Sequence, residues 1–265
     1  MKTKLLLPAL AALLATAQGL FAQTPAPVPA AAAPSASWTL TPAFVSQYML
    51  RGVRLGGASL QPVIEYASGP LVVGLWNNFP LKSKVPGQSD PEIDPYFSYT
   101  FEIAKDLTLQ PGAILYLYPD ANKNNGFYKT TFEPSLALNY TVEGIKFTPK
   151  VYLDTVLDQT LWELNVAYSI PLKDFGTEIA FLGSYGTFKA NDALENSSPA
   201  TKNWGSYWLV GLTLPIQINK ESKLSIGWAY TEGRENFFKQ GSAPKSVNTG
   251  AVGRGVTTVS YAFTF

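Results

Sequence analysis

The sequence predicts an all-β protein, a transmembrane antiparallel up-and-down β-barrel of twelve strands. Three observations predict it: segments that alternate between apolar and polar side chains, an export leader, and connections that alternate in length. A period of two turns apolar side chains toward lipid on one face of a barrel wall and polar ones toward the interior on the other. The 14 Tyr, 15 Phe and 6 Trp also suit a barrel, which places aromatic residues at the membrane interfaces.

The last segment, residues 255–265, shows the alternation most clearly. One face carries the apolar and aromatic side chains Val259, Tyr261, Phe263 and Phe265. The other face carries the small and polar side chains Thr258, Ser260, Ala262 and Thr264. A strand that ends on Phe resembles the closing strand of bacterial outer-membrane barrels, so we expect the four apolar residues to be the membrane-insertion signal. An ordinary edge strand that ends on Phe is the alternative.

The N-terminal residues predict export. Residues 1–22 read as a signal peptide, because two lysines precede an apolar run over residues 5–17 that is too short to span a bilayer. Cleavage is expected after Ala22 or at the end of that run. Residues 23–36 form an uncharged Ala/Pro-rich linker, and residues 37–265 form the barrel domain. We therefore expect a protein of the Gram-negative bacterial outer membrane that a cleaved signal peptide exports.

Alternating segments follow one another through the barrel domain. They cover 38–50, 57–67, 70–79, 92–103, 106–118, 127–141, 145–155, 159–172, 176–188, 203–217, 222–232 and 255–265. The even-numbered connections are mostly tight turns, such as the one at 142–144, while most odd-numbered ones are longer. Outer-membrane barrels have short periplasmic turns and longer external loops. Because the link at 156–158 is short, one alternative is that the strands on either side of it form a single continuous strand. The barrel would then have ten or eleven strands.

The composition excludes several function classes. The chain has no Cys and no His, so no Ser-His pair, disulfide or thiolate metal site can form. A net charge of +1 offers no electrostatic basis for nucleic-acid binding. We expect no enzymatic activity, no cofactor and no metal.

A family resemblance lies near the start of the barrel. Residues 44–54 (FVSQYMLRGVR) hold a Ser-x-Tyr-x-x-Arg-Gly element, residues 60–66 (LQPVIEY) a proline-containing strand, and residues 74–77 (GLWN) a Gly-x-Trp element. In this order they resemble the TorF family of porin-like proteins, apart from Gln47, where Asn is usual, and a shorter Arg-Gly loop. The resemblance implies a bacterial outer-membrane barrel that forms a small pore, with no defined substrate and no catalytic residues.

Charged side chains on the polar faces are candidate lumen residues. They are Arg51, Glu65, Lys129, Glu133, Lys150, Asp154 and Glu163. Pairing across the turn at 142–144 predicts Ser135 opposite Lys150, and the next hairpin predicts Asn165 opposite Lys150.

This pairing also places Glu133 and Glu163 diagonal to Lys150 on one wall. One interpretation is a charged constriction that selects small polar solutes. The other is a set of interior salt bridges that brace a narrow barrel. Arg51 and Arg54 flank Gly52 at the external end of the first hairpin, where they either attract anions and lipopolysaccharide phosphates or are simply solvated.

The sequence therefore predicts a porin-like channel for passive diffusion of small polar solutes or ions through a narrow charged lumen. Acidic side chains outnumber basic ones there, so at most a slight cation preference is expected. The alternative is a non-conducting barrel with a structural, adhesive or receptor role through the loop at 233–254. The expected partners are outer-membrane lipid and lipopolysaccharide, the barrel-assembly machinery and small polar solutes, with no nucleic acid.

Overall fold

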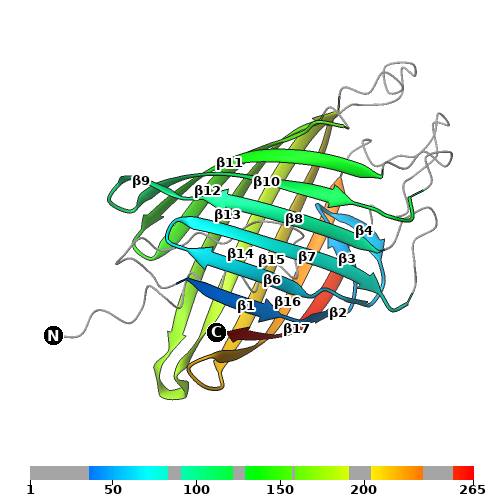
Figure 1. Ribbon diagram of the computed structural model, residues 1–265. Coiled ribbons are helices and arrows are strands. Elements are labelled where there is room, and N and C mark those ends of the chain that lie inside the picture. Colours follow the sequence, from blue (N-terminus) through cyan, green and yellow to red (C-terminus); the bar gives the residue numbers. More distant parts are fainter. Residues whose placement is uncertain (1–35, 83–90, 122–128, 157–158, 191–203, 235–252) are drawn as a thin grey trace, which may run out of the picture.

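The computed structural model describes residues 36–82, 91–121, 129–156, 159–190, 204–234 and 253–265. The predicted signal peptide and all but the last residue of the predicted linker lie outside these ranges. The described chain forms a closed antiparallel barrel of twelve strands, as predicted (Figure 1). Among the described residues, no helix has the length and apolar character needed to cross a membrane.

Three of the wall strands are broken into two pieces, and nine are continuous. The broken ones are β1(Ser37–Thr41) with β2(Ala43–Val45), β5(Ser59–Leu60) with β6(Val63–Ser68), and β8(Glu92–Tyr99) with β9(Phe101–Ala104). The continuous ones are β7(Leu71–Pro80), β10(Leu107–Leu117), β11(Thr130–Val142), β12(Ile145–Asp154), β13(Gln159–Leu172), β14(Thr177–Ala190), β15(Trp204–Gln217), β16(Ser222–Arg234) and β17(Arg254–Thr264). A 3-10 turn, η2(Lys173–Phe175), joins β13 to β14.

The last strand closes the barrel against the first. β17 pairs with β1 through Leu40 and Phe263, and with β2 through Phe44 and Val259. The predicted alternation of β17 is confirmed: its apolar side chains are exposed on the outer face, whereas Val256, Thr258, Ser260 and Ala262 are buried. The link at 156–158 does not hide a continuous strand, because Asp154 pairs with Gln159 across it.

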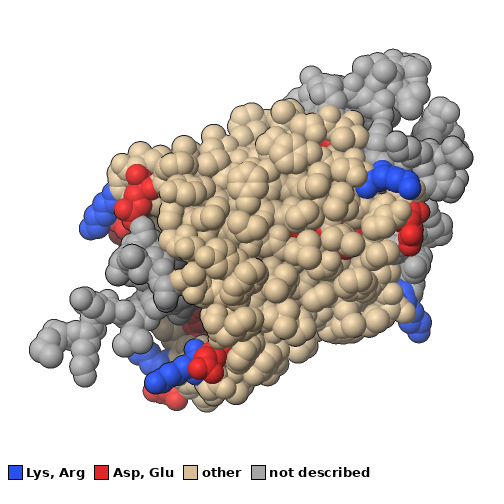
Figure 2. Space-filling model, in the orientation of Figure 1, with Lys and Arg blue, Asp and Glu red and all other residues tan. Residues whose placement is uncertain are grey.

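The outer surface of the barrel is an apolar belt. Large exposed side chains on it include Val73, Phe97, Leu136, Trp162, Leu212 and Val259. On the face shown in Figure 2, Lys, Arg, Asp and Glu gather at the two ends, and the band between them is almost free of charge. A charge in the middle of a bilayer would cost about 2–4 kcal/mol, so this distribution suits a membrane-spanning wall.

The first predicted strand was too long. The chain leaves the wall after Val45, and residues 48–56 form a separate hairpin of β3(Tyr48–Leu50) and β4(Val53–Gly56). The strict alternation also stops there, because the consecutive residues Tyr48 and Met49 are both buried. Such a segment has no lipid-facing side and packs on both faces instead. We call residues 48–56 the inner hairpin.

The predicted register around Lys150 was wrong by two residues. Lys150 lies opposite Ala137 on β11 and opposite Glu163 on β13, rather than opposite Ser135 and Asn165. The first error arises because the strands pair about the turn residues 143 and 144, which both adopt positive φ, whereas the predicted pairing was centred between residues 142 and 143. The second arises because the β12–β13 link is centred one residue earlier. An even shift leaves every side chain on its predicted face.

Candidate functional site

The tip of the inner hairpin is fastened to β16. The backbone N–H of Gly233 donates to the carbonyl oxygen of Gly52 over 3.0 Å. Gly52 has φ +77°, and a Cβ at this position would lie 2.3 Å from the Gly233 nitrogen. Both the positive φ and the close backbone approach require glycine here. Together with Arg51, which also has positive φ, Gly52 closes a two-residue turn between β3 and β4.

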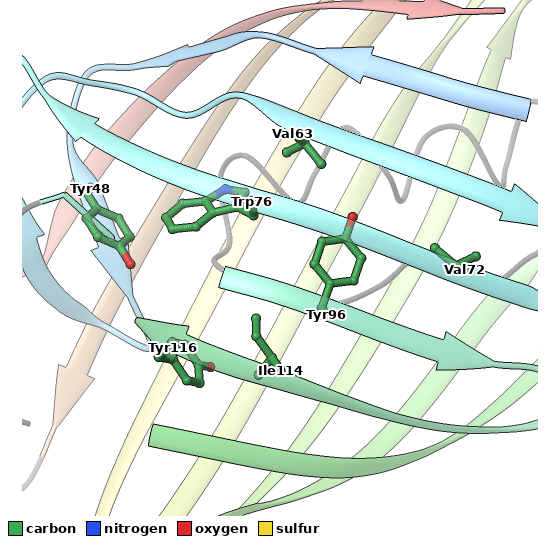
Figure 3. Close-up of a cluster of buried hydrophobic side chains, with 7 residues drawn as sticks. All are labelled: Tyr48, Val63, Val72, Trp76, Tyr96, Ile114 and Tyr116. Atoms are coloured by element: carbon green, nitrogen blue, oxygen red, sulfur yellow. The ribbon is translucent and has the colours of Figure 1, made fainter. Parts of the chain in front are cut away.

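An aromatic cluster anchors the base of the hairpin to β7, β8 and β10. Tyr48 packs beside Trp76, with ring centroids 5.6 Å apart, and Figure 3 shows both among the buried side chains of these strands. The Tyr48 hydroxyl donates to Glu92 over 2.6 Å. Burial, together with the nearby Glu92 carboxylate, raises the pKa of Tyr48 well above its ordinary value. Tyr48 therefore stays neutral and keeps its proton for this hydrogen bond.

An ion pair joins the hairpin to β11. Both terminal nitrogens of Arg51 donate to the Glu133 carboxylate, over 2.7 and 2.8 Å. Glu133 is only 2% exposed, and it also accepts a hydrogen bond from the Tyr116 hydroxyl over 3.1 Å. A two-point Arg–carboxylate contact fixes orientation as well as distance. Of the interpretations left open for Arg51, the ion pair excludes simple solvation at the mouth, and Arg51 stays among the lumen candidates.

Arg51 also reaches the next wall strand. Its guanidinium carbon lies 4.8 Å from the centre of the Tyr152 ring on β12, and the Lys150 nitrogen lies 4.3 Å from the same ring. Such distances allow cation–π attraction. Val53 of the hairpin packs against a buried cluster that contains Tyr152 and Tyr207.

Glu163 on β13 accepts several side-chain hydrogen bonds in the part of the wall next to Tyr152. It accepts hydrogen bonds from the Tyr152 hydroxyl over 2.9 Å, from the Asn165 amide over 2.7 Å and from the Tyr207 hydroxyl. Lys150 stands directly opposite on β12. Two carboxylates, Glu133 and Glu163, and two cations, Arg51 and Lys150, thus meet around one aromatic ring. The inner hairpin, together with Glu133, Lys150, Tyr152 and Glu163, is the candidate constriction.

The remaining predicted lumen residues lie apart from this group. Asp154, the last residue of β12, is buried and accepts hydrogen bonds from the Thr131 hydroxyl over 2.5 Å and from the Val156 backbone over 3.0 Å. Glu65 is half-buried on β6 and accepts a hydrogen bond from the Tyr96 hydroxyl over 2.8 Å. Lys129 is exposed just before β11 begins, so it does not line the constriction.

The sequence interpretation missed the inward fold of the hairpin, and with it the roles of Tyr48 and Glu92. One signal was present: Tyr48 and Met49 interrupt the alternation immediately before Arg51-Gly52. Their partners could not be read from spacing, because Tyr48 and Glu92 are 44 positions apart and Arg51 and Glu133 are 82 apart.

Residues 30–263 match a family model described as "Bacterial protein of unknown function (Gcw_chp)". The chain belongs to this family. No curated protein matches the chain.

Solved structures show what fold this family member shares. The NanC porin aligns with a TM-score of 0.53 at 9% identity, over 85% of this chain and 98% of that one. An outer-membrane channel from Pseudomonas putida F1 aligns with a TM-score of 0.49 at 9% identity, over 89% and 97%. LpxR from Salmonella typhimurium aligns with a TM-score of 0.47 at 10% identity, over 86% and 99%. At such low identity the NanC alignment carries the fold alone, which is that of an outer-membrane barrel.

Proposed function

We propose that the protein is an outer-membrane channel through which small polar solutes or ions diffuse passively, narrowed by the inner hairpin. The observation that carries the proposal is the Arg51–Glu133 ion pair, which ties a hairpin inside the barrel to the opposite wall. Charged side chains that project into a passage select solutes by size and charge. If the interior of the barrel only had to be filled, apolar side chains would fill it without the desolvation free energy that a buried ion pair requires.

The polarity of the interior supports a wet passage. Buried side chains along the inner face include Gln110, Asn139, Thr148, Thr213, Ser225, Thr258 and Ser260. An eight-stranded barrel is filled by its own side chains and a sixteen-stranded one holds a broad aqueous pore, so twelve strands leave room for a narrow passage. The likeness to the NanC porin and the TorF-like elements around Arg51 and Trp76 agree with this size class.

The location and partners follow from the same proposal. The apolar belt suits the outer membrane, with lipid and lipopolysaccharide around it, after export by a cleaved signal peptide in residues 1–22. The barrel-assembly machinery would recognise the closing strand through Val259, Tyr261, Phe263 and Phe265. We propose no enzymatic activity and no cofactor, since the chain contains neither His nor Cys.

Single-channel recording in planar bilayers tests the proposal. The refolded protein should show discrete openings, and Arg51→Ala should raise their conductance about twofold, because the tip loses its tie to Glu133 and the passage widens. Arg54→Ala is the matched control: Arg54 lies in the same hairpin but donates to Gln47 over 2.6 Å rather than to the wall, so its conductance should stay unchanged.

Silence from protein that is folded and inserted would contradict the channel. One observation favours the alternative, a closed barrel: the hairpin contacts β7, β8 and β10 on one side and β11, β12 and β16 on the other, so it crosses the passage. If the hairpin closes the passage, the barrel is non-conducting and has a structural, adhesive or receptor role through the loop at 233–254. Residues 235–252 of this loop lie outside the described ranges.

A further inference from the structure

In the described part of the chain, the periplasmic half of the lumen contains a buried lysine without an acidic neighbour. Lys146 is the second residue of β12 and is only 6% exposed. Its cross-strand neighbours are both neutral: Thr141 on β11 and Ala167 on β13. Within the described ranges, no ion pair or hydrogen bond involves its ammonium group.

Two other lysines on the inner face differ from it in this respect. Lys150 lies opposite Glu163 and over the Tyr152 ring. Lys223 on β16 lies close enough to Glu178 for each charge to act on the other. The described strands of the wall therefore supply an acid to these two lysines but not to Lys146.

Burying an ammonium group without an opposite charge is costly, and an anion that reaches the site relieves the cost. A hydroxyl group beside the lysine could donate to the same anion, because Thr141 lies directly opposite Lys146 on β11.

We propose that Lys146 is the centre of a binding site for an oxyanion group, a carboxylate or a phosphate, at the periplasmic end of the lumen. A lysine in this setting binds such a group by charge-assisted hydrogen bonds. The further step, that permeating solutes carry this group, rests on the proposed channel. The binding site itself does not, because a closed barrel could hold the same anion.

Isothermal titration calorimetry of the refolded protein in a non-ionic detergent tests the site, with sodium acetate and inorganic phosphate as separate probes. At least one probe should bind to the unmodified protein. Lys146→Met should weaken that binding about tenfold or more, because a charge-assisted contact is lost. Lys146→Arg should retain it within about threefold, since the charge remains. The matched control Lys223→Met should also stay within about threefold, because Lys223 already has Glu178 beside it.

Each outcome decides the matter. Acetate binding alone would identify a carboxylate site, phosphate binding alone a phosphate site, and binding of both a general oxyanion site. No binding of either probe, or Lys146→Met binding as tightly as the unmodified protein, would overturn the proposal. If Lys146→Met does not fold, Lys146→Gln serves as the second neutral variant. A protein that conducts but binds neither probe would refute this site and leave the channel standing, whereas a silent protein that binds would do the reverse.

Discussion

Two rows of the barrel wall are built in the same way. In each, a Glu, a Gly and a Tyr lie side by side on three neighbouring strands. The Tyr side chain extends across the Gly, and its hydroxyl donates a hydrogen bond to the Glu. The first row lies on β6, β7 and β8, and the second on β13, β14 and β15. The first row is Glu65, Gly74 and Tyr96, and the second row is Glu163, Gly186 and Tyr207.

The glycines make the reach possible. A Cβ on Gly74 would lie 2.3 Å from the ring of Tyr96, and a Cβ on Gly186 would lie 2.3 Å from the ring of Tyr207. Each ring therefore lies flat against a wall position that has no side chain. This Glu–Gly–Tyr arrangement links three strands through one hydrogen bond, and it narrows the lumen only slightly because the ring lies flat on the wall.

The rows differ in what else they contact. Within the described ranges, Glu65 has the Tyr96 hydroxyl as its side-chain hydrogen-bond partner, so the carboxylate of the first row contacts only the wall, while the Tyr96 ring belongs to the aromatic cluster that anchors the hairpin. Glu163 also accepts hydrogen bonds from Tyr152 and Asn165 and faces Lys150, and Tyr207 belongs to the cluster against which Val53 of the inner hairpin packs. The bracing and constriction interpretations of the lumen charges therefore apply to different places. The following substitutions test that difference.

The largest effect is expected where an acid is removed. Glu163→Ala leaves three donors without their acceptor and removes the negative charge opposite Lys150, so the free energy of unfolding should fall by about 3 kcal/mol. Glu65→Ala removes one hydrogen bond and should cost about 1 kcal/mol. Urea unfolding in lipid vesicles, followed by tryptophan fluorescence, measures both values. Reversal potentials in a salt gradient add a second readout, and only Glu163→Ala should shift them toward anions.

Equal losses from the two variants, or an equal shift in selectivity, would contradict the distinction between the rows. The result would then favour wall bracing for both carboxylates and remove Glu163 from the candidate constriction.

The next effect comes from filling the glycine positions. Gly74→Ala and Gly186→Ala each force a tyrosine ring off the wall, and overpacking of this kind costs about 2 kcal/mol in unfolding free energy. The two losses should be similar, because the predicted clashes are the same. Conductance should separate them: displacing Tyr207 moves a neighbour of Val53 in the hairpin, whereas displacing Tyr96 disturbs only the hairpin's aromatic anchor. We expect the larger conductance change from Gly186→Ala.

Much of this comparison could be predicted from sequence, because each strand records its own faces. The period of two placed Glu65, Glu133, Lys150 and Glu163 on inner faces, and an error of two residues in register left those faces unchanged. The strand number followed in the same way, from the turn residues between alternating segments.

What could not be predicted depends on contacts between distant parts of the chain. The Glu–Gly–Tyr rows require the register of three strands at once, and that register depends on where each turn is centred. Backbone conformation at Glu143, a non-glycine residue with φ +50°, shifts one of these centres. The inner hairpin depends on Glu133, far along the chain, accepting Arg51. Local alternation shows only that the wall pattern stops near Tyr48.

The smallest effect, and the sharpest test of the comparison, comes from removing single hydroxyl groups. Tyr96→Phe takes away the side-chain donor of Glu65 and leaves a half-buried carboxylate without it, which should cost about 1 kcal/mol. Tyr207→Phe should cost less, about 0.5 kcal/mol, because Tyr152 and Asn165 still donate to Glu163. The order is thus the reverse of that for the two alanine variants. The Glu163 row should lose more unfolding free energy than the Glu65 row when its acid is removed, and less when its tyrosine hydroxyl is removed. A Tyr207→Phe loss larger than the Tyr96→Phe loss would mean that the Glu163 network depends on one donor rather than sharing its load among three.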